Sequence, residues 1–161
     1  MIKLARKFTN LKDLEKYVQD EVYKSINKNE YMLEDVASQV MEKVTEKVVY
    51  DAYTPETYER RKEKNGLLDR RLMMFTYHGK TKNGTVSYFE NTALGNDNLE
   101  DTFLVDTIEH GLEQNWNKTG EWSKPRPFVQ KTAEVLNSGE IYPFALDTVK
   151  KMLKKSGLNI K

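Results

Sequence analysis

Acidic side chains and a histidine lie close together in the stretch VDTIEHG, residues 105–111. Asp106, Glu109 and His110 are residue types that bind divalent metal ions or transfer protons, and in a helix Asp106 and Glu109 would share a face because residues three apart are neighbours. A two-metal nuclease would need further carboxylates and a lysine nearby. Because the chain has 25 acidic residues, such a cluster arises easily by chance, and a structural interpretation is favoured over a metal-dependent nuclease.

The usual signatures of enzymes are missing from the rest of the sequence. The chain contains no cysteine, and neither His78 nor His110 has a second histidine or cysteine at the spacing of metal ligands. No serine lies in a Gly-x-Ser-x-Gly context, and neither of the common glycine-rich phosphate loops occurs. We therefore expect a protein that is not an enzyme, with no catalytic residues, no metal and no other cofactor.

The segment most suggestive of binding is YDAYTPETYERRKEKNGLLD, residues 50–69. Aromatic rings stack on bases and guanidinium groups bind phosphate, so Tyr58, Arg60 and Arg61 fit a nucleic-acid site. The same residue types are enriched at protein interfaces, where arginine also pairs with carboxylates. Packing or a protein interface is favoured, because 26 basic residues against 25 acidic ones leave a net charge of +1, too little to attract a polyanion.

Composition bounds the class of protein. Hydrophobic residues make up 38% and charged residues 32% of the 161 residues, with a mean hydropathy of -0.76. This balance suits exposed helices or a subunit that completes its burial in an assembly. The sequence has no apolar run of bilayer or signal-peptide length, so we expect no membrane association. The length suits a single domain over residues 1–161.

Local signals predict the order of the elements. Asn10 followed by Asp13 resembles a helix N-cap, and apolar residues at spacings of three and four predict a helix over 10–27, regarded as an extension of the domain. A second stripe predicts a helix over 31–48, or a bent continuation of the first. Pro55 disfavours helical geometry at the preceding residue, so residues 50–69 are predicted to be a long extended or looping segment.

The second half of the chain predicts a hairpin followed by helices. The pair Asn83-Gly84 suits a type I′ turn within a β-hairpin over 71–92. Apolar residues from Leu99 to Leu112 predict a short helix ending near Gly111, although the strand alternative stays open there. Prolines 127 and 143 can open two further helices, the last of which Gly157 would end. The predicted class is α+β, with N-terminal amphipathic helices, a central antiparallel hairpin and C-terminal helices.

Several motifs together resemble a known group of proteins. One stretch resembles a segment of small morphogenesis proteins from tailed phages and prophages of Gram-positive bacteria. It reads Tyr50-x-x-Tyr53-x-Pro55-x-x-Tyr58-x-Arg60-Arg61, followed by Gly-Leu-Leu-Asp at 66–69. Ile-Glu-His-Gly at 108–111, Pro-Arg-Pro-Phe at 125–128 and the ending from 153 to 160 fit the same likeness in the same order. The likeness covers about residues 32–160 and is to the tail-completion or head–tail joining group.

That resemblance implies a structural protein of the virion neck or tail, assembled in the cytoplasm of the host bacterium. It implies a homo-oligomeric ring, a hexamer or dodecamer, between a connector or stopper and a tail-tube or tail-terminator protein, with DNA passing through its lumen. In this interpretation Lys80 and Lys82 face the lumen or the tail. The expected interface residues are Tyr50, Tyr53, Pro55, Tyr58, Arg60, Arg61, Leu67, Leu68, Trp122, Arg126 and Phe128. The alternative is a nucleic-acid-binding accessory protein of a phage or prophage.

Overall fold

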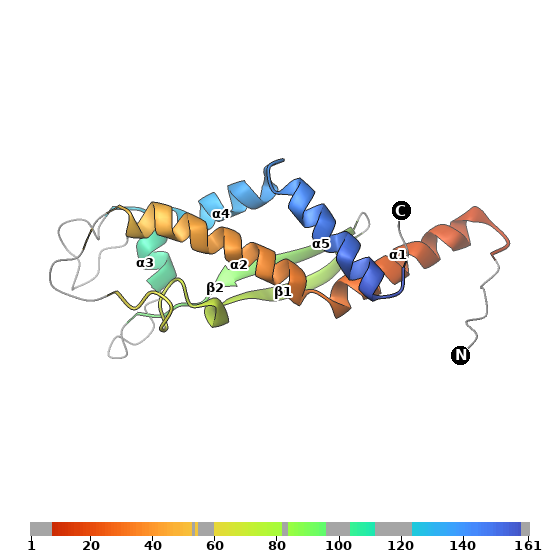
Figure 1. Ribbon diagram of the computed structural model, residues 1–161, viewed down its shortest axis with the longest axis horizontal. Helices are drawn as coiled ribbons and strands as arrows, with labels where there is room; N and C mark the ends of the chain where they lie inside the picture. The colour runs from red at the N-terminus through yellow and green to blue at the C-terminus, as the bar shows by residue number, and fades with distance from the viewer. Residues whose placement is uncertain are drawn as a thin grey trace.

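The amphipathic patterns become helices packed around a two-stranded hairpin, which confirms the α+β prediction (Figure 1). The computed structural model describes residues 8–52, 54, 60–81, 84–95, 104–111 and 124–158. Its elements are α1 (Leu11–Lys28), α2 (Tyr31–Thr45), a π-helical turn (Glu46–Tyr50), a 3-10 turn (Arg70–Leu72), β1 (Met73–Thr81), β2 (Gly84–Asn91), α3 (Leu104–His110), α4 (Phe128–Asn137) and α5 (Tyr142–Lys155).

Helix α1 begins where the sequence predicts. The side chain of Asn10 accepts a hydrogen bond from the backbone N–H of Asp13 at 2.8 Å and donates one to the Asp13 carboxylate at 2.8 Å, which satisfies a backbone donor that the first turn would leave free. The chain then breaks at Asn29, so α2 is a separate helix and not a continuation of α1. Helix α1 projects from the rest of the molecule, and its C-terminal half lies beside α5 (Figure 1).

The hydrophobic core lies between α2, α4, the base of the hairpin and the residues that precede it. Helix α2 runs along one face of the hairpin, and α4 crosses α2 on the opposite side (Figure 1). The fully buried members of the core are Met41, Val49, Leu67, Met73, Ala93, Ile108 and Phe128. Burial of these apolar side chains is the main favourable contribution to folding.

The hairpin confirms the prediction for residues 71–92. Its ladder runs from Met73 opposite Asn91 to Thr81 opposite Gly84, with an irregularity between Phe75 and Tyr77. The predicted turn residue Asn83 lies outside the described residues. Among the hairpin side chains that the structure describes, Met74, Val86 and Tyr88 are large, apolar and exposed on the outward face.

The C-terminal helices also end at the predicted residues. Residues 104–110 form helix and not strand, and Gly111 follows them with a φ of 63°. Helix α5 has Pro143 in its first turn and Gly157 after its end with a φ of 83°. The N–H groups of Gly157 and Leu158 donate to the carbonyls of Lys154 and Leu153, both at 2.9 Å, which is the hydrogen-bond pattern of a Schellman C-cap.

Pro127 occupies the N-cap position directly before α4. Leu99, Leu112 and the last three residues lie outside the described residues. Within the part of the chain that the structure describes, no helix is long and apolar enough to cross a membrane.

Candidate interaction surface

Residues 60–69 form tight turns with neither helix nor strand, so of the two predicted forms, extended or looping, these residues have the looping one. Tyr50 itself is the last residue of the π-helical turn. Lys62 and Asn65 have positive φ angles of 40° and 58°, which reverse the direction of the chain. The Leu68 N–H then donates to the Lys62 carbonyl at 3.2 Å. These turns bring the end of the segment back beneath α2.

Tyr50 packs against the core and is covered by two cations. The Arg60 guanidinium lies 5.0 Å and the Lys62 ammonium 5.4 Å from the centroid of the Tyr50 ring, within the range of cation–π attraction. Arg60 also donates to the Tyr50 carbonyl at 2.8 Å. Burial raises the pKa of the Tyr50 hydroxyl to about 12, although the nearby Arg60 charge opposes that increase. Tyr50 is thus held within its own chain.

Arg61 links the segment to the residues that follow the hairpin. Its Nη2 donates to the Leu94 carbonyl at 2.7 Å. The sequence interpretation gave Arg60 and Arg61 carboxylate partners at an interface, whereas both side chains donate to backbone carbonyls of this chain. Their positive charges are therefore used in part to hold the segment in place.

Four of the expected interface residues are buried within the chain. Leu67, Leu68, Arg126 and Phe128 have little or no exposed surface, and Leu67 and Phe128 belong to the core cluster. Apolar side chains so enclosed have no area left to offer a neighbouring subunit. This correction follows from long-range packing, because the sequence pattern of the segment does not show which of its faces meets α2.

The remaining expected residues are not tested by the geometry. Tyr53, Pro55, Tyr58, Trp122 and Lys82 lie outside the described residues. Lys80 is described only as a backbone position in β1, opposite Thr85.

Asp69 is a residue that the sequence interpretation missed. Its carboxylate accepts hydrogen bonds from the backbone N–H groups of Asn65 at 2.9 Å and Arg71 at 3.1 Å, and from the Arg71 Nε at 2.9 Å. These bonds, above all those from the Arg71 side chain, hold the pKa of Asp69 well below its usual range. The available signal was an aspartate directly before a helical turn, which is a favoured N-cap residue.

Arg70 fastens the entry of the hairpin to α2. Its Nε and Nη2 donate to the two carboxylate oxygens of Glu42 at 2.6 and 2.7 Å, and its Nη1 donates to Asp35 at 2.9 Å. A planar guanidinium is suited to this paired geometry. The signal in the sequence was two carboxylates seven residues apart, which places them on one face of α2. Nothing local identifies Arg70 as their partner.

Glu109, from the acidic cluster, caps another helix. Its buried carboxylate accepts hydrogen bonds from the backbone N–H groups of Val129 at 2.8 Å and Gln130 at 3.0 Å, at the N-terminus of α4. The position is electrostatically favourable, because a helix N-terminus carries partial positive charge. Asp106 and His110 are exposed on α3.

An open groove of about 500 Å³ lies between β2, α3 and α4, and the acidic cluster lines part of it. Asp106, Glu109 and His110 contribute from α3, with Asn91 and Gln130 on the facing elements. Over the described ranges, no three histidine, cysteine, aspartate or glutamate side chains are placed to hold a metal ion. Because Glu109 already binds two N–H groups, the groove gives little support to the nuclease interpretation.

Comparison with known proteins places the chain in a family. The YomN family model matches residues 10–155, which run from the cap of α1 to the end of α5. The chain belongs to the YomN family. YomN is a phage-associated family, so the protein is phage-related, a coarser statement than the tail-completion likeness. Because the YomN match begins at residue 10, α1 is part of the family pattern. No curated protein and no solved structure matches the chain.

Proposed function

We propose that the chain is a structural protein of a phage or prophage particle, a ring subunit that joins the head to the tail or completes the tail. It acts by binding neighbouring subunits and not by catalysis. The observation that carries this proposal is the distribution of exposed apolar side chains over separate parts of a phage-related chain. Such exposure is unfavourable in water and is relieved by assembly.

Among the described residues, most of the exposed large apolar side chains lie on three parts of the fold, and the others are Tyr31 on α2 and Leu94 after β2. The three groups are Leu11, Leu14 and Val18 on α1, Met74, Val86 and Tyr88 on the hairpin, and Tyr142, Phe144 and Leu146 on α5. A ring subunit needs surfaces for its two neighbours and for the proteins above and below it. Three separate patches suit that requirement better than they suit a single cleft.

Several described side chains that could take part in chemistry are held in structural hydrogen bonds instead, which also supports a role without catalysis. Glu109 caps α4, Arg61 binds the Leu94 carbonyl and Arg70 clamps α2. The body of the subunit is thereby fixed, so that its exposed surfaces keep one arrangement for assembly. Rigid surfaces lose less entropy when they bind.

The proposed partners are further copies of the chain in a hexameric or dodecameric ring, a connector or stopper protein on one side, and a tail-tube or tail-terminator protein on the other. The proposed location is the neck or tail of the virion, after assembly in the host cytoplasm. The hairpin tip, with Lys80 and Lys82, is proposed to face the lumen and to contact passing DNA without sequence preference.

The nucleic-acid-binding alternative receives less support. Arg60 and Arg61 donate to carbonyls of their own chain, and Tyr50 is covered by cations. A nucleic-acid binder would be retained on DNA at low salt and released steeply as salt rises. Absence of retention at low salt would remove this alternative.

The direct test is deletion of the gene from an inducible prophage or phage. We expect filled heads and separate tails in electron micrographs, and restoration of joined particles when the gene is supplied in trans. The protein should also be detected in purified virions. Joined, infectious particles from the deletion strain, or virions that lack the protein, would refute the proposal.

A further inference from the structure

The N-terminal half of α1 carries an apolar stripe that the described part of the chain leaves uncovered. Leu11 is 83% exposed and Val18 is 49% exposed, with Leu14 between them on the same face. The C-terminal half of the helix is different, because Ser25 there is buried against α5 and donates to the Met152 carbonyl at 3.1 Å. We call Leu11, Leu14 and Val18 the α1 stripe.

The α1 stripe is bordered by negative charge. Glu15 lies four residues after Leu11 and three before Val18, so it stands beside the stripe on the helix surface. From residue 11 to residue 21 the helix has four carboxylates and two lysines, a net charge of −2. A partner surface that is apolar and basic would therefore fit this half of α1.

Helix α5 combines exposed apolar side chains in its first turns with lysines from residue 150 onward. Tyr142 is 67% and Leu146 is 39% exposed, and Lys150 continues the same line because the three residues are spaced by four. We call Tyr142, Leu146 and Lys150 the α5 patch. Helix α5 has four lysines and one aspartate, a net charge of +3. Its lysines, Lys151 first among them, lower the pKa of Asp147, which agrees with a positive local field.

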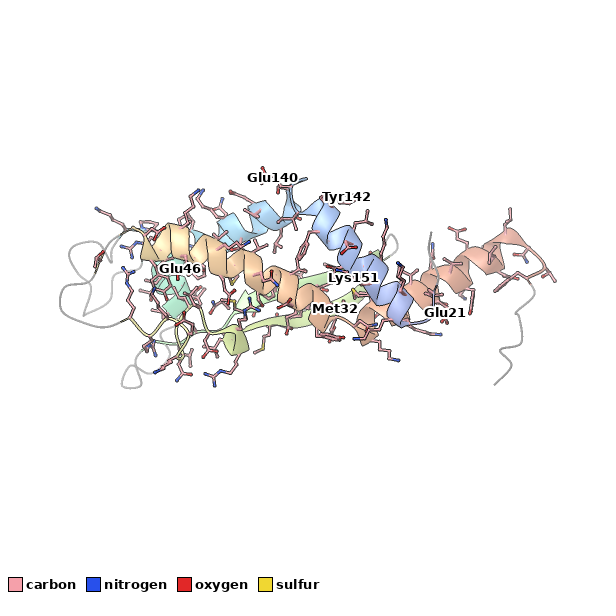
Figure 2. All side chains as sticks on the ribbon, in the orientation of Figure 1. Glu21, Met32, Glu46, Glu140, Tyr142 and Lys151 are labelled. Atoms are coloured by element: carbon pink, nitrogen blue, oxygen red, sulfur yellow. The ribbon has the colours of Figure 1, made fainter. Side chains whose placement is uncertain are left out.

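The stripe and the patch lie at different places on one molecule. Figure 2 shows Tyr142 at the corner where the chain passes from α4 into α5, and Glu21 on α1 beyond the opposite end of α5. Helix α1 has 18 residues, about 27 Å of length at 1.5 Å per residue. Its free end therefore extends away from the α5 patch of its own chain.

We infer that the α1 stripe of one copy docks on the α5 patch of the next copy, in a head-to-tail contact. The apolar side chains bury each other, and Glu15 comes close to Lys150. The symmetric alternative, stripe against stripe, would bring two helix ends of net charge −2 together, which is repulsive. A contact between two different surfaces repeats from copy to copy and yields a closed ring or a filament.

This inference deepens the proposed function, since it assigns the surfaces that would join neighbours in the ring. It requires that copies of the chain form a ring, but it holds wherever in the particle that ring lies.

The test uses two variants of the full chain. Leu14→Glu with Val18→Glu alters only the stripe, and Tyr142→Glu with Leu146→Glu alters only the patch. By sedimentation velocity, each variant alone should self-associate at least about tenfold more weakly than the unaltered chain. An equal mixture should form a one-to-one dimer, because each variant supplies the surface that the other lacks.

Each other outcome overturns the inference. Normal assembly of the patch variant together with failure of the stripe variant would indicate stripe-to-stripe pairing. Three further results would each contradict head-to-tail docking. They are normal assembly of the stripe variant, absence of a dimer in the mixture, and an unaltered chain that stays monomeric at the highest concentration. Circular dichroism melting of every variant establishes that the altered chains are folded.

A charge exchange tests the contact without changing apolar area. Lys150→Glu should weaken self-association roughly tenfold at low salt, and addition of Glu15→Lys to the same chain should restore it. Lys131→Glu, an equal charge change on the exposed side of α4, is the matched control and should have no effect. Failure of the second change to restore association would count against the pairing of Glu15 with Lys150 and overturn the docking arrangement.

The results also separate this inference from the proposed function. If the stripe and patch variants assemble normally while gene deletion still prevents head–tail joining, only the docking inference is lost. If docking is confirmed but virions lack the protein, the proposed virion role is lost.

Discussion

At the scale of single residues, Gly66 shows how closely the 60–69 turns are packed. A Cβ added there would lie 2.5 Å from the Lys62 carbonyl oxygen and 2.8 Å from the Lys62 nitrogen. Both are backbone atoms, so a side-chain rotation cannot relieve the overlap. The turn, and with it Leu67 in the core, requires a residue without a side chain at this position.

Gly66→Ala is expected to destabilise the protein by roughly 2 to 4 kcal/mol, because the turn must open to admit the methyl group. Gly139→Ala is the matched control, since no atom lies within 4 Å of the added Cβ, and its effect should stay within about 1 kcal/mol. Urea denaturation followed by circular dichroism measures both values. Equal stability of the two variants would contradict the close approach at Gly66.

The hydroxyl of Tyr50 provides a prediction for alkaline pH. Burial raises its pKa to about 12 in the folded chain, above the ordinary value of 10.0. The neutral form therefore favours folding, and this contribution is fully present below pH 10 and is lost as the pH rises toward 12. Ultraviolet titration of tyrosinate should lose its last step in Tyr50→Phe. A Tyr50→Phe chain that keeps every step would show that Tyr50 is not the late titrating group.

At the scale of elements, Glu109 connects α3 to α4. Glu109→Gln should destabilise the fold by about 1 to 3 kcal/mol, because an amide oxygen can accept from one N–H group while the amide NH₂ would face the other. Asp106→Asn, on the exposed side of α3, should change stability by less than about 0.5 kcal/mol. Thermal melts of both variants provide the comparison. Similar stability, together with loss of a metal-dependent nuclease activity in both, would support the catalytic interpretation instead.

The elements were predictable where their signals are local. The local signals are the pair Asn10 and Asp13, the apolar spacing of α2, the hairpin pattern, and the glycines after α3 and α5. Each signal acts within a few residues, and the structure has helices or strands at all of these places. The hydrogen-bond partners of Leu67, Arg70 and Glu109 were not predictable, because each partner is about 20 or more residues away in the sequence. Burial and pairing over such separations depend on packing, and a periodic pattern in one segment does not encode it.

At the scale of the whole molecule, stability is expected to be uneven. Helix α2 contacts α4, α5 and the hairpin, whereas the first half of α1 carries exposed apolar side chains. Amide hydrogen exchange of the unassembled chain should be fast over residues 14–20 and slowest in α2, because local opening follows the extent of packing. Assembly should slow exchange in the first half of α1. Equal protection of both helices in the isolated chain would contradict this view.

The attachment of α1 to the body has a consequence for assembly size. The Ser25 and Ser156 hydroxyl oxygens lie 2.8 Å apart in a hydrogen bond, and Asn29 donates to the Ser25 carbonyl at 2.9 Å and to Ser156 at 3.2 Å. Hydrogen bonds are directional, unlike apolar contacts, so this buried junction fixes the angle at which α1 leaves the molecule. In a head-to-tail ring, that angle sets the rotation from one subunit to the next and hence the number of subunits that close the circle. The three small polar side chains Ser25, Asn29 and Ser156 would then determine how many subunits the ring contains.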